Sequence, residues 1–530
     1  MRTLRRTPVL AVALGLAAAS PLGASSVTPM DLPTLVRLST VVVRGEVEAL
    51  ATAPDDQDRG IETWVTLRAD EGLKGAAAGD RVLLQLPGGV WGDRHTLVFG
   101  VPGFAVGEQV VVFAARTRGG HLTVTGLFQG KYRIESPVGG EAEAVPDGGA
   151  GAERVGRPAA PRRREPLSTF LSRVRDLVRL PSGAAAALEA GADAPPPGAE
   201  SVPSSFTFLN PLIPMRWFEP DQGLPIAVRY NPAGSPVFTD GVRGGFVQSL
   251  QNWTDVTGST VVLADGGDTT QACRVFFDGS VVSHGDPCGQ MTPFDTTTCS
   301  GVLAITGVSG FTLESKTVNG VGFLRMTEAD TVFNAGIDCF LGGDRRNYEE
   351  VLTHELGHLI GLGHTCDDSF TPACVPGTPE DDALMRAFAH GGGRGGAPHA
   401  LDIDGARFLY PPPGFVDAKL NATSFAAGQQ LRLTADFNGT ATADVYLPLV
   451  KPDGTFVSLA PGFPAGVLAP YASGVPLRFL KDVALFNSTF GAASQPGSYR
   501  IVAILVRAGA DPRQAANWLA YDVAPFSLGP

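Results

Sequence analysis

Three histidines and their spacing are the first feature of this sequence that could carry chemistry. Residues 351–364 read VLTHELGHLIGLGH, and they contain His354, His358 and His364, three of only eight histidines in 530 residues. Imidazoles four positions apart project from the same face of a helix. Neutral imidazole is a good ligand for zinc. The pattern therefore predicts one zinc ion held by these three side chains.

Two residues between the histidines fit the same interpretation. Gly361 is expected to end the helix, because the chain must turn to bring His364 back to the ion and glycine tolerates the positive φ of such a turn. Glu355 can reach a water molecule on the metal without being a ligand. Three protein ligands leave a fourth position open, which is typical of catalytic zinc. We therefore expect hydrolysis by a zinc-bound water with Glu355 as the general base.

The extended pattern H-E-x-x-H-x-x-G-x-x-H resembles that of the metzincin zinc proteases, and in particular the matrixins. Met385, in Ala383-Leu384-Met385, resembles the methionine turn of that family, and LDIDGARFLY at 401–410 resembles the matrixin closing helix. The resemblance covers residues 206–413. It implies a zinc metalloendopeptidase with a protein or peptide substrate, in which Met385 is a packed floor and not a ligand. The family also makes calcium a candidate second cofactor.

The resemblance further implies that an extended substrate pairs with an edge strand at residues 301–306. The matrixin pocket wall M-x-P-x-Y is replaced by MRAFA at 385–389, so a cleavage preference does not transfer. His284, Gly285 and Asp286 resemble the start of a structural zinc loop. Ile305 stands where a later histidine of that loop would lie, so no second zinc is predicted.

All six cysteines lie between residues 273 and 374. An even number in an exported protein predicts three disulfides, although six cysteines allow 15 pairings. Short loops favour Cys366–Cys374 and Cys288–Cys299, which leaves Cys273 with Cys339. A zinc-thiolate site is the rival interpretation, and no C-x-x-C pair supports it.

The N-terminus and the charge indicate where the protein acts. Residues 1–24 have the basic start, the apolar run and the small-residue cleavage sites of a signal peptide, with the run too short to span a membrane. We expect a protein without a transmembrane anchor that is secreted to the extracellular space or the periplasm. The net charge of −12 argues against a nucleic-acid partner.

The length predicts several domains. The expected fold is multidomain: an α+β metzincin (matrixin-like) zinc protease domain at 206–413, flanked by an all-β domain at 27–136 and a C-terminal β-sandwich at 414–530. Residues 137–205 have the composition of a linker with one amphipathic helix near 167–178. Asn347 and Glu350 predict a capping box for the histidine-bearing helix. His95, His121, His390 and His399 are expected at the surface.

Other functions remain open at this stage. The chain could be an adhesion or matrix protein with an inactive zinc domain, or a zinc amidohydrolase acting on a non-protein substrate. Residues 1–272 contain no cysteine, so no thiolate from a pro-region can block the zinc. Cover by the N-terminal domain or by the helix near 167–180, relieved by a cut within 137–205, is the predicted form of latency. A chain without latency is the alternative.

Overall fold

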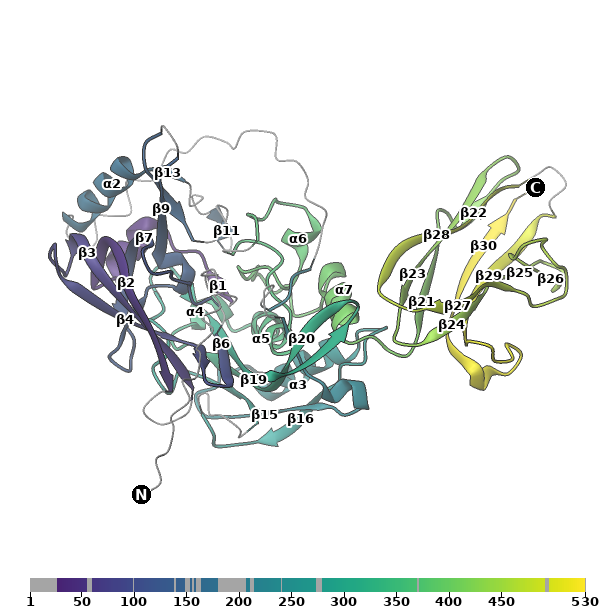
Figure 1. Cartoon of the computed structure of the whole chain (residues 1–530), viewed down its shortest axis with the longest axis horizontal. Coiled ribbons are helices and arrows are strands. Elements are labelled where there is room, and N and C mark those ends of the chain that lie inside the picture. Colours follow the sequence, from purple (N-terminus) through teal and green to yellow (C-terminus); the bar gives the residue numbers. More distant parts are fainter. Residues whose placement is uncertain are drawn as a thin grey trace, which may run out of the picture.

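The computed structural model describes most of the chain. The described residues are 26–54, 60–98, 100–137, 140–147, 153–154, 157–158, 164–179, 206–209, 214–239, 241–272, 279–368, 371–490 and 495–529. The expected signal peptide and Cys273 therefore lie outside them. Figure 1 shows a large body containing the N-terminal and central parts of the chain, and a separate unit at the C-terminal end.

The N-terminal sheet region (residues 26–147) supplies seven strands of an eight-stranded sheet with the order β13-β10-β9-β7-β2-β3-β4, in which β8 pairs with β7 and β13 comes from the later segment before α2. Helix α1 (Leu32–Leu38) and helix α2 (Leu167–Arg179) pack on this sheet through Phe113, Tyr132 and Phe170. The predicted amphipathic helix is thus present and docks on its neighbour. The strands are β2 (Val41–Pro54), β3 (Ile61–Lys74), β4 (Arg81–Pro87), β7 (Gln109–Arg116), β8 (Leu122–Val124), β9 (Lys131–Glu135), β10 (Glu143–Pro146) and β13 (Glu165–Pro166).

The central region (residues 206–413) contributes most of a second eight-stranded sheet, with the order β16-β15-β17-β20-β19-β6-β5 and β14 beside β20. Strands β16, β15, β17 and β20 run parallel, and β19 runs antiparallel to β20. The last two strands of this order come from the N-terminal part of the chain. The strands are β5 (Gly89–Trp91), β6 (Arg94–Val98), β14 (Met215–Arg216), β15 (Ile226–Tyr230), β16 (Leu263–Asp268), β17 (Ser280–Ser283), β19 (Ala304–Val318) and β20 (Val321–Phe333).

Five helices accompany this sheet: α3 (Val242–Thr254), α4 (Asp338–Leu341), α5 (Arg345–Leu359), α6 (Pro379–Asp382) and α7 (Ala400–Leu409). Helix α3 buries Phe246, Leu250 and Trp253, whose spacing of three and four residues places them on one face. The Trp253 indole donates to the Thr353 carbonyl oxygen at 2.8 Å, so α3 is fixed against α5. Helix α5 is buried along nearly its whole length and begins after Asp344, whose side chain accepts from the Arg346 amide. The expected capping box at Asn347 and Glu350 is therefore wrong.

The C-terminal unit (residues 415–528) packs a three-stranded sheet, β21-β23-β28, against a seven-stranded one. Its apolar cluster contains only its own residues. The strands are β21 (Phe415–Leu420), β22 (Ser424–Phe425), β23 (Gln430–Asn438), β24 (Thr442–Tyr446), β25 (Pro448–Val450), β26 (Phe456–Ser458), β27 (Pro470–Pro476), β28 (Leu480–Thr489), β29 (Gly497–Arg507) and β30 (Trp518–Leu528).

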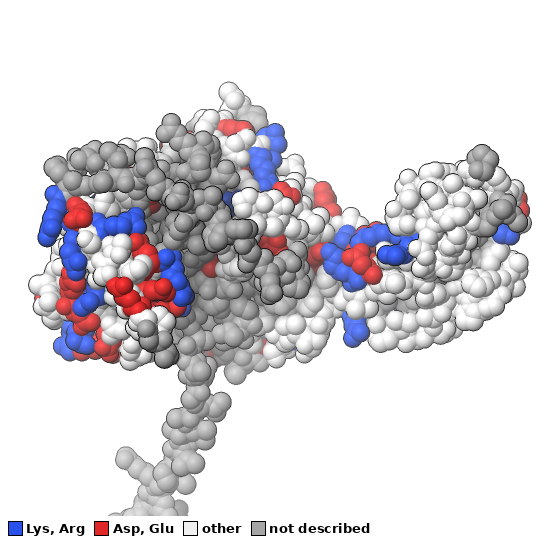
Figure 2. All heavy atoms as spheres, turned by 90° about the horizontal axis from the view of Figure 1, so that it is seen from above, with Lys and Arg blue, Asp and Glu red and all other residues white. Residues whose placement is uncertain are grey.

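Short elements complete the described chain. Strand β1 (Val27–Thr28) pairs with β18 (Gly301–Val302), and β11 (Glu153–Arg154) pairs with β12 (Arg157–Pro158). Single 3₁₀ turns lie at Leu127–Gly130, Glu219–Gln222 and Ala515–Asn517. Among the described residues, no helix is both long and apolar enough to cross a bilayer. On the face seen in Figure 2, charges of both signs are interspersed on the N-terminal side, and the C-terminal unit shows few.

The expected fold class, an α+β metzincin (matrixin-like) zinc protease domain flanked by an N-terminal all-β domain and a C-terminal β-sandwich, is wrong in its α+β catalytic domain. The molecule is mainly β and is built from several sheets. Long strands replace the expected compact α+β unit: β19 and β20 form an extended hairpin, and β6 pairs with β19 from residue 307 to residue 311. Pairing between distant strands leaves no local trace in the sequence, so it could not be read there.

The cysteines pair differently from the expectation. Cys366 is bonded to Cys374, as its short loop suggested, but Cys299 is bonded to Cys339. The expected Cys288–Cys299 and Cys273–Cys339 pairs are therefore wrong. Cys299 reaches Cys339 because the β19–β20 hairpin returns the chain to its starting point, which loop length alone does not reveal. No described cysteine is free.

Candidate metal centre

Three histidine side chains converge at the C-terminal end of α5. His354 and His358 lie one turn apart on this helix, and His364 follows the turn after it. The Nε2 atoms of His358 and His364 lie 2.9 and 3.3 Å from the Nε2 atom of His354. All three side chains are buried. The ring nitrogens therefore surround one point inside the protein.

The opposite nitrogen of two of the rings is held by a carbonyl acceptor. Nδ1 of His354 lies 2.8 Å from the Leu384 carbonyl oxygen, and Nδ1 of His358 lies 2.8 Å from that of Leu362. A carbonyl oxygen can only accept, so each Nδ1 carries the hydrogen and each Nε2 carries a lone pair. Nδ1 of His364 lies 3.2 Å from an Asp368 carboxylate oxygen.

This arrangement fits a cation. Lone pairs 2.9 Å apart repel each other, and no hydrogen is left to join them. Burial lowers the pKa of His354 to about 3, and burial lowers the pKa of His358 well below its usual value. Both rings are therefore neutral near pH 7, which is the form that binds metal. Two neutral imidazoles with oriented second nitrogens, joined by the His364 ring, are a donor set suited to zinc.

The turn after α5 is what brings the third histidine back. Gly361 has φ of +109°, and a Cβ there would lie 2.6 Å from the Met215 carbonyl oxygen. Only glycine fits such a position. The Leu209 amide donates to the Gly361 carbonyl oxygen at 2.9 Å, and Thr207 donates to that of His364. The turn is therefore fixed by the start of the central region.

Glu355 lies beside the histidines and is buried. Its Oε2 accepts from the Thr306 hydroxyl at 2.7 Å, and its Oε1 accepts from the Ser26 amide at 2.9 Å. Burial raises the pKa of this carboxyl to about 7, and the hydrogen bonds from Thr306 and Ser26 oppose that rise. The structure therefore brings Glu355 together with a strand residue from β19 and with the start of the described chain.

Met385 lies beneath the histidine helix. A Cβ added at Gly357 would lie 2.2 Å from the Met385 sulfur and 2.8 Å from the Trp253 ring, so glycine is required between His354 and His358. Asp402 on α7 accepts from the Leu384 amide at 2.8 Å and from the Met385 amide at 3.0 Å. The same Leu384 orients His354, so Asp402 positions a ligand through one intervening residue.

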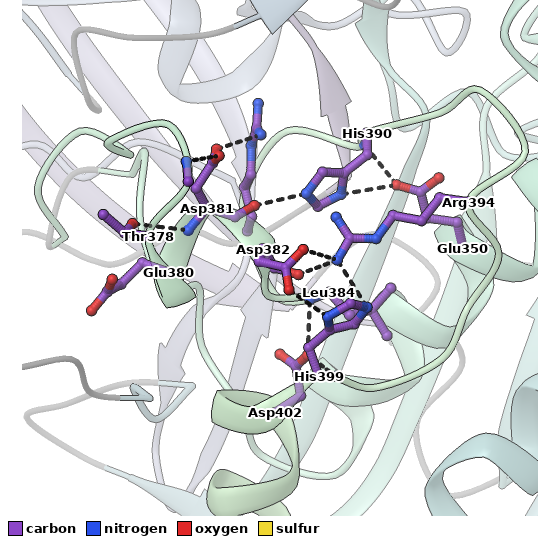
Figure 3. A network of polar contacts seen from close by, with 12 residues as sticks. Glu350, Thr378, Glu380, Asp381, Asp382, Leu384, His390, Arg394, His399 and Asp402 are labelled. Atoms are coloured by element: carbon purple, nitrogen blue, oxygen red, sulfur yellow. Dashed lines mark hydrogen bonds and ion pairs between the residues drawn. The ribbon is translucent and has the colours of Figure 1, made fainter.

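A polar network braces the long segment between His364 and α7 (Figure 3). Glu350 on α5 accepts from the His390 amide at 2.6 Å and from the Gly391 amide at 2.9 Å. His399 donates its amide to Asp402 at 2.7 Å, and its ring lies 2.7 Å from Asp382. The expectation that His390 and His399 are exposed is wrong, because both are half-buried in this network.

The remaining histidines lie apart from the centre. His121 is exposed, as expected. His95 is buried in β6 with Nε2 3.1 Å from the Met215 sulfur, so the prediction of a surface position is wrong. His284 is buried between the Asn231 carbonyl oxygen and the Tyr348 hydroxyl, at 3.1 Å from each. A second cluster, Cys366, Asp367 and Cys374, holds a disulfide, so its thiolates are not free to bind metal.

Sequence reasoning missed the contacts of Ser26 and Thr306 with Glu355. It also missed the positioning role of Asp402. Thr306 lies in the stretch predicted as an edge strand, and Asp402 lies in the segment that resembles the closing helix, so both were near a readable pattern. Ser26 lies 329 positions from its partner Glu355. No local pattern could have placed it there.

The chain is partly similar to a known protease. No protein-family model matches it. Over 128 residues it is 29% identical to Metalloendoproteinase 2-MMP of Arabidopsis thaliana, a stretch that makes up 24% of this chain and 29% of the relative. The chain thus spans less than a third of the length of that relative. The similarity suggests a metalloprotease relationship and nothing finer.

Similarity to solved structures is low. The sporulation control protein Spo0M from Bacillus subtilis has a TM-score of 0.15 at 13% identity, over 22% of this chain and 50% of that one. A β-glucosidase from Listeria innocua, in complex with isofagomine, has a TM-score of 0.14 at 11% identity, over 61% of this chain and 48% of that one. Neither value supports a conclusion about fold or function.

Proposed function

We propose that this protein is a secreted zinc-dependent endopeptidase. The observation that carries the proposal is the convergence of three buried imidazoles beside the buried carboxyl group of Glu355. His354, His358 and His364 would hold the ion. When bound there, zinc would polarise a substrate carbonyl and lower the pKa of water.

The protein's own groups supply the rest of the chemistry. Glu355 lies within reach of the histidine centre and is the candidate general base, which takes a proton from water and passes it to the leaving amine. The Thr306 hydroxyl donates to Oε2 of Glu355 and so directs the other oxygen, Oε1, toward the reacting groups. Asp402 and Leu384 keep the His354 ring in orientation. Met385 packs under α5 and is not assigned as a ligand.

A peptide substrate is favoured over a small amide because the centre borders a seat for an extended strand. Residues 301–303 offer one row of backbone groups and residues 387–389 offer another. A strand between two such rows satisfies its main-chain hydrogen bonds on both sides, which is how extended peptides are recognised. A small amide would use neither row.

The test is a digest of a denatured protein mixture by the exported chain, with cleavage sites mapped and zinc supplied or chelated. Activity is expected with zinc and not with chelator. E355Q should retain zinc but lose roughly 100-fold or more of the turnover. H358A should lose both zinc and turnover.

H121A is the matched control, because His121 is an exposed histidine outside the centre. It should behave as the parent does. Near-parent turnover by E355Q would remove Glu355 as the base. Full zinc retention by H358A would contradict the ligand set. Hydrolysis of small amides without any peptide cleavage would favour the amidohydrolase alternative.

A further inference from the structure

The position for an extended strand beside the metal centre, between residues 301–303 and residues 387–389, is filled by the chain itself. Residues 26–30, called the N-terminal segment here, comprise Ser26, Val27, Thr28, Pro29 and Met30. Strand β1 within it pairs antiparallel with β18, with Val27 opposite Val302 and Thr28 opposite Gly301. The Leu303 amide donates to the Ser26 carbonyl oxygen at 2.8 Å. Backbone groups of residues 301–303 are therefore already paired with the N-terminal segment.

The opposite edge is engaged as well. The Val27 amide donates to the Ala387 carbonyl oxygen at 3.3 Å, and the Ala389 amide donates to the Val27 carbonyl oxygen at 3.2 Å. Val27 thereby pairs in parallel with Phe388. The N-terminal segment is thus the middle strand of three. Both main-chain polar groups of Val27 are satisfied by the wall after Met385.

The direction of the segment places its first residue at the candidate base. The Ser26 amide donates to Oε1 of Glu355 at 2.9 Å, and the chain then passes between residues 301–303 and 387–389 to Met30, which is bound by Gln129. A base that has cleaved a peptide bond faces the nitrogen of the leaving half, to which it gives its proton. Ser26 offers its nitrogen in that position. The segment therefore lies as the amine-side half of a peptide would.

The side chains show what this seat prefers. Val27 is 0% exposed and packs in one apolar cluster with Val302, Ala387 and Phe388. The second residue after the cleaved bond is therefore expected to be apolar in a good substrate. A charged side chain there would be desolvated without a partner, which is costly.

The far end of the segment is clamped by the N-terminal sheet region. Gln129 accepts from the Met30 amide at 2.8 Å and donates to the Thr28 carbonyl oxygen at 3.3 Å. The Gly301 amide donates to the Thr28 hydroxyl at 2.8 Å. Asp31 then caps α1 by accepting from the Thr34 amide. The N-terminal segment is therefore held by specific hydrogen bonds at both of its ends.

We propose that the N-terminal segment is an internal occupant of the peptide-binding cleft and keeps the enzyme latent. This inference rests on the proposed function. It replaces the predicted cover by the helix near 167–180, since α2 packs on the N-terminal sheet. A cut within 137–205 leaves the segment clamped by Gln129 and by both walls. Activation must therefore displace residues 26–30 themselves.

The first test compares V27D with the parent in the full exported chain, at matched zinc, on an unstructured protein substrate. The buried carboxylate should expel the segment and raise the cleavage rate at least tenfold. V106D is the matched control, because Val106 is 65% exposed in the same region and away from the cleft. It should stay as slow as the parent. Q129A loosens the clamp without touching the cleft and should also raise the rate.

A second test measures the seat directly. The peptide Ser-Val-Thr-Pro-Met should inhibit V27D and should bind the V27D/E355Q double variant in a fluorescence assay. The peptide Ser-Asp-Thr-Pro-Met should do neither. Peptide binding without cleavage by any variant would overturn the proposed protease function. It would still support the N-terminal segment as the occupant of the cleft. Equal cleavage rates for the parent, V27D and Q129A, with all three folded and no peptide binding, would overturn the proposal that the N-terminal segment occupies the cleft. The proposed protease function would remain.

Discussion

The N-terminal sheet region and the C-terminal unit both flank the metal centre in sequence, but they relate to it in opposite ways. Val27 and Val98 share one apolar cluster with Val332 and Phe388 of the central region, and β5 and β6 extend the central sheet. The C-terminal unit has a cluster of its own. It meets the central region through contacts such as the Lys481–Asp404 ion pair and the hydrogen bond from the Phe479 amide to Asn319 at 3.0 Å.

This difference shows how a flanking segment can act on a site. A region that shares a core and a sheet with the site can place residues in it, as the Ser26 amide at Glu355 shows. A unit that borders only helix α7 and other outer parts of the central region, such as Asn319 in the β19–β20 turn, has no such access. The N-terminal sheet region is therefore expected to control the centre, and the C-terminal unit to be separable from it.

The largest expected effect comes from removing each region. A chain lacking residues 26–147 would expose Val302, Ile305 and Phe388, all buried, and the long edge of β19. It should not give soluble, zinc-binding protein. A chain lacking residues 414–530 should stay folded and bind one zinc. Gel filtration followed by metal analysis distinguishes the two, and an N-terminally shortened chain that binds zinc would break the comparison.

A smaller effect is expected from one phenylalanine in each cluster. Phe388 packs against Phe128 of the N-terminal sheet region, and Phe526 packs against Phe425 within the C-terminal unit. Each substitution by alanine should cost roughly 3–5 kcal/mol of unfolding free energy through the cavity it leaves. F388A should lower the transition of the large body, and F526A should lower only that of the C-terminal unit. Calorimetry checks this, and a shared shift would contradict independent cores.

The centre could be predicted from the sequence much better than the fold. The three clustered histidines, Gly361 and Met385 follow from local spacing, because a helix and one turn bring them together over few residues. The position of β6 beside β19 depends on pairing across some 200 residues, and propensity is silent on that. Cys299–Cys339 follows from the same hairpin. Ser26 could not be found at all, since a serine 329 positions from Glu355 has no distinctive local pattern.

The least effect is expected from pH, and it too should separate the regions. Burial lowers the pKa of His95 and of His284 to about 4. Residues 415–528 contain no histidine. The unfolded chain takes up protons near pH 6.5 whereas the folded body does not, so stability is full above about 6.5 and falls as pH drops toward 4. Each histidine should cost the large body roughly 2 kcal/mol between pH 7 and 5.

The C-terminal unit should show no such loss over that range, because residues 415–528 contain no histidine. Midpoints of the two thermal transitions, measured at pH 7 and pH 5 with zinc held constant, provide the comparison. H95Q should remove the roughly 2 kcal/mol that His95 contributes to the loss in the large body, while leaving the other transition unchanged. The difference between parent and H95Q cancels any change in zinc binding, since His95 contacts Met215 and not the metal centre. An H95Q slope equal to the parent's would mean that His95 takes up no proton on unfolding, and the burial argument for β6 would fail.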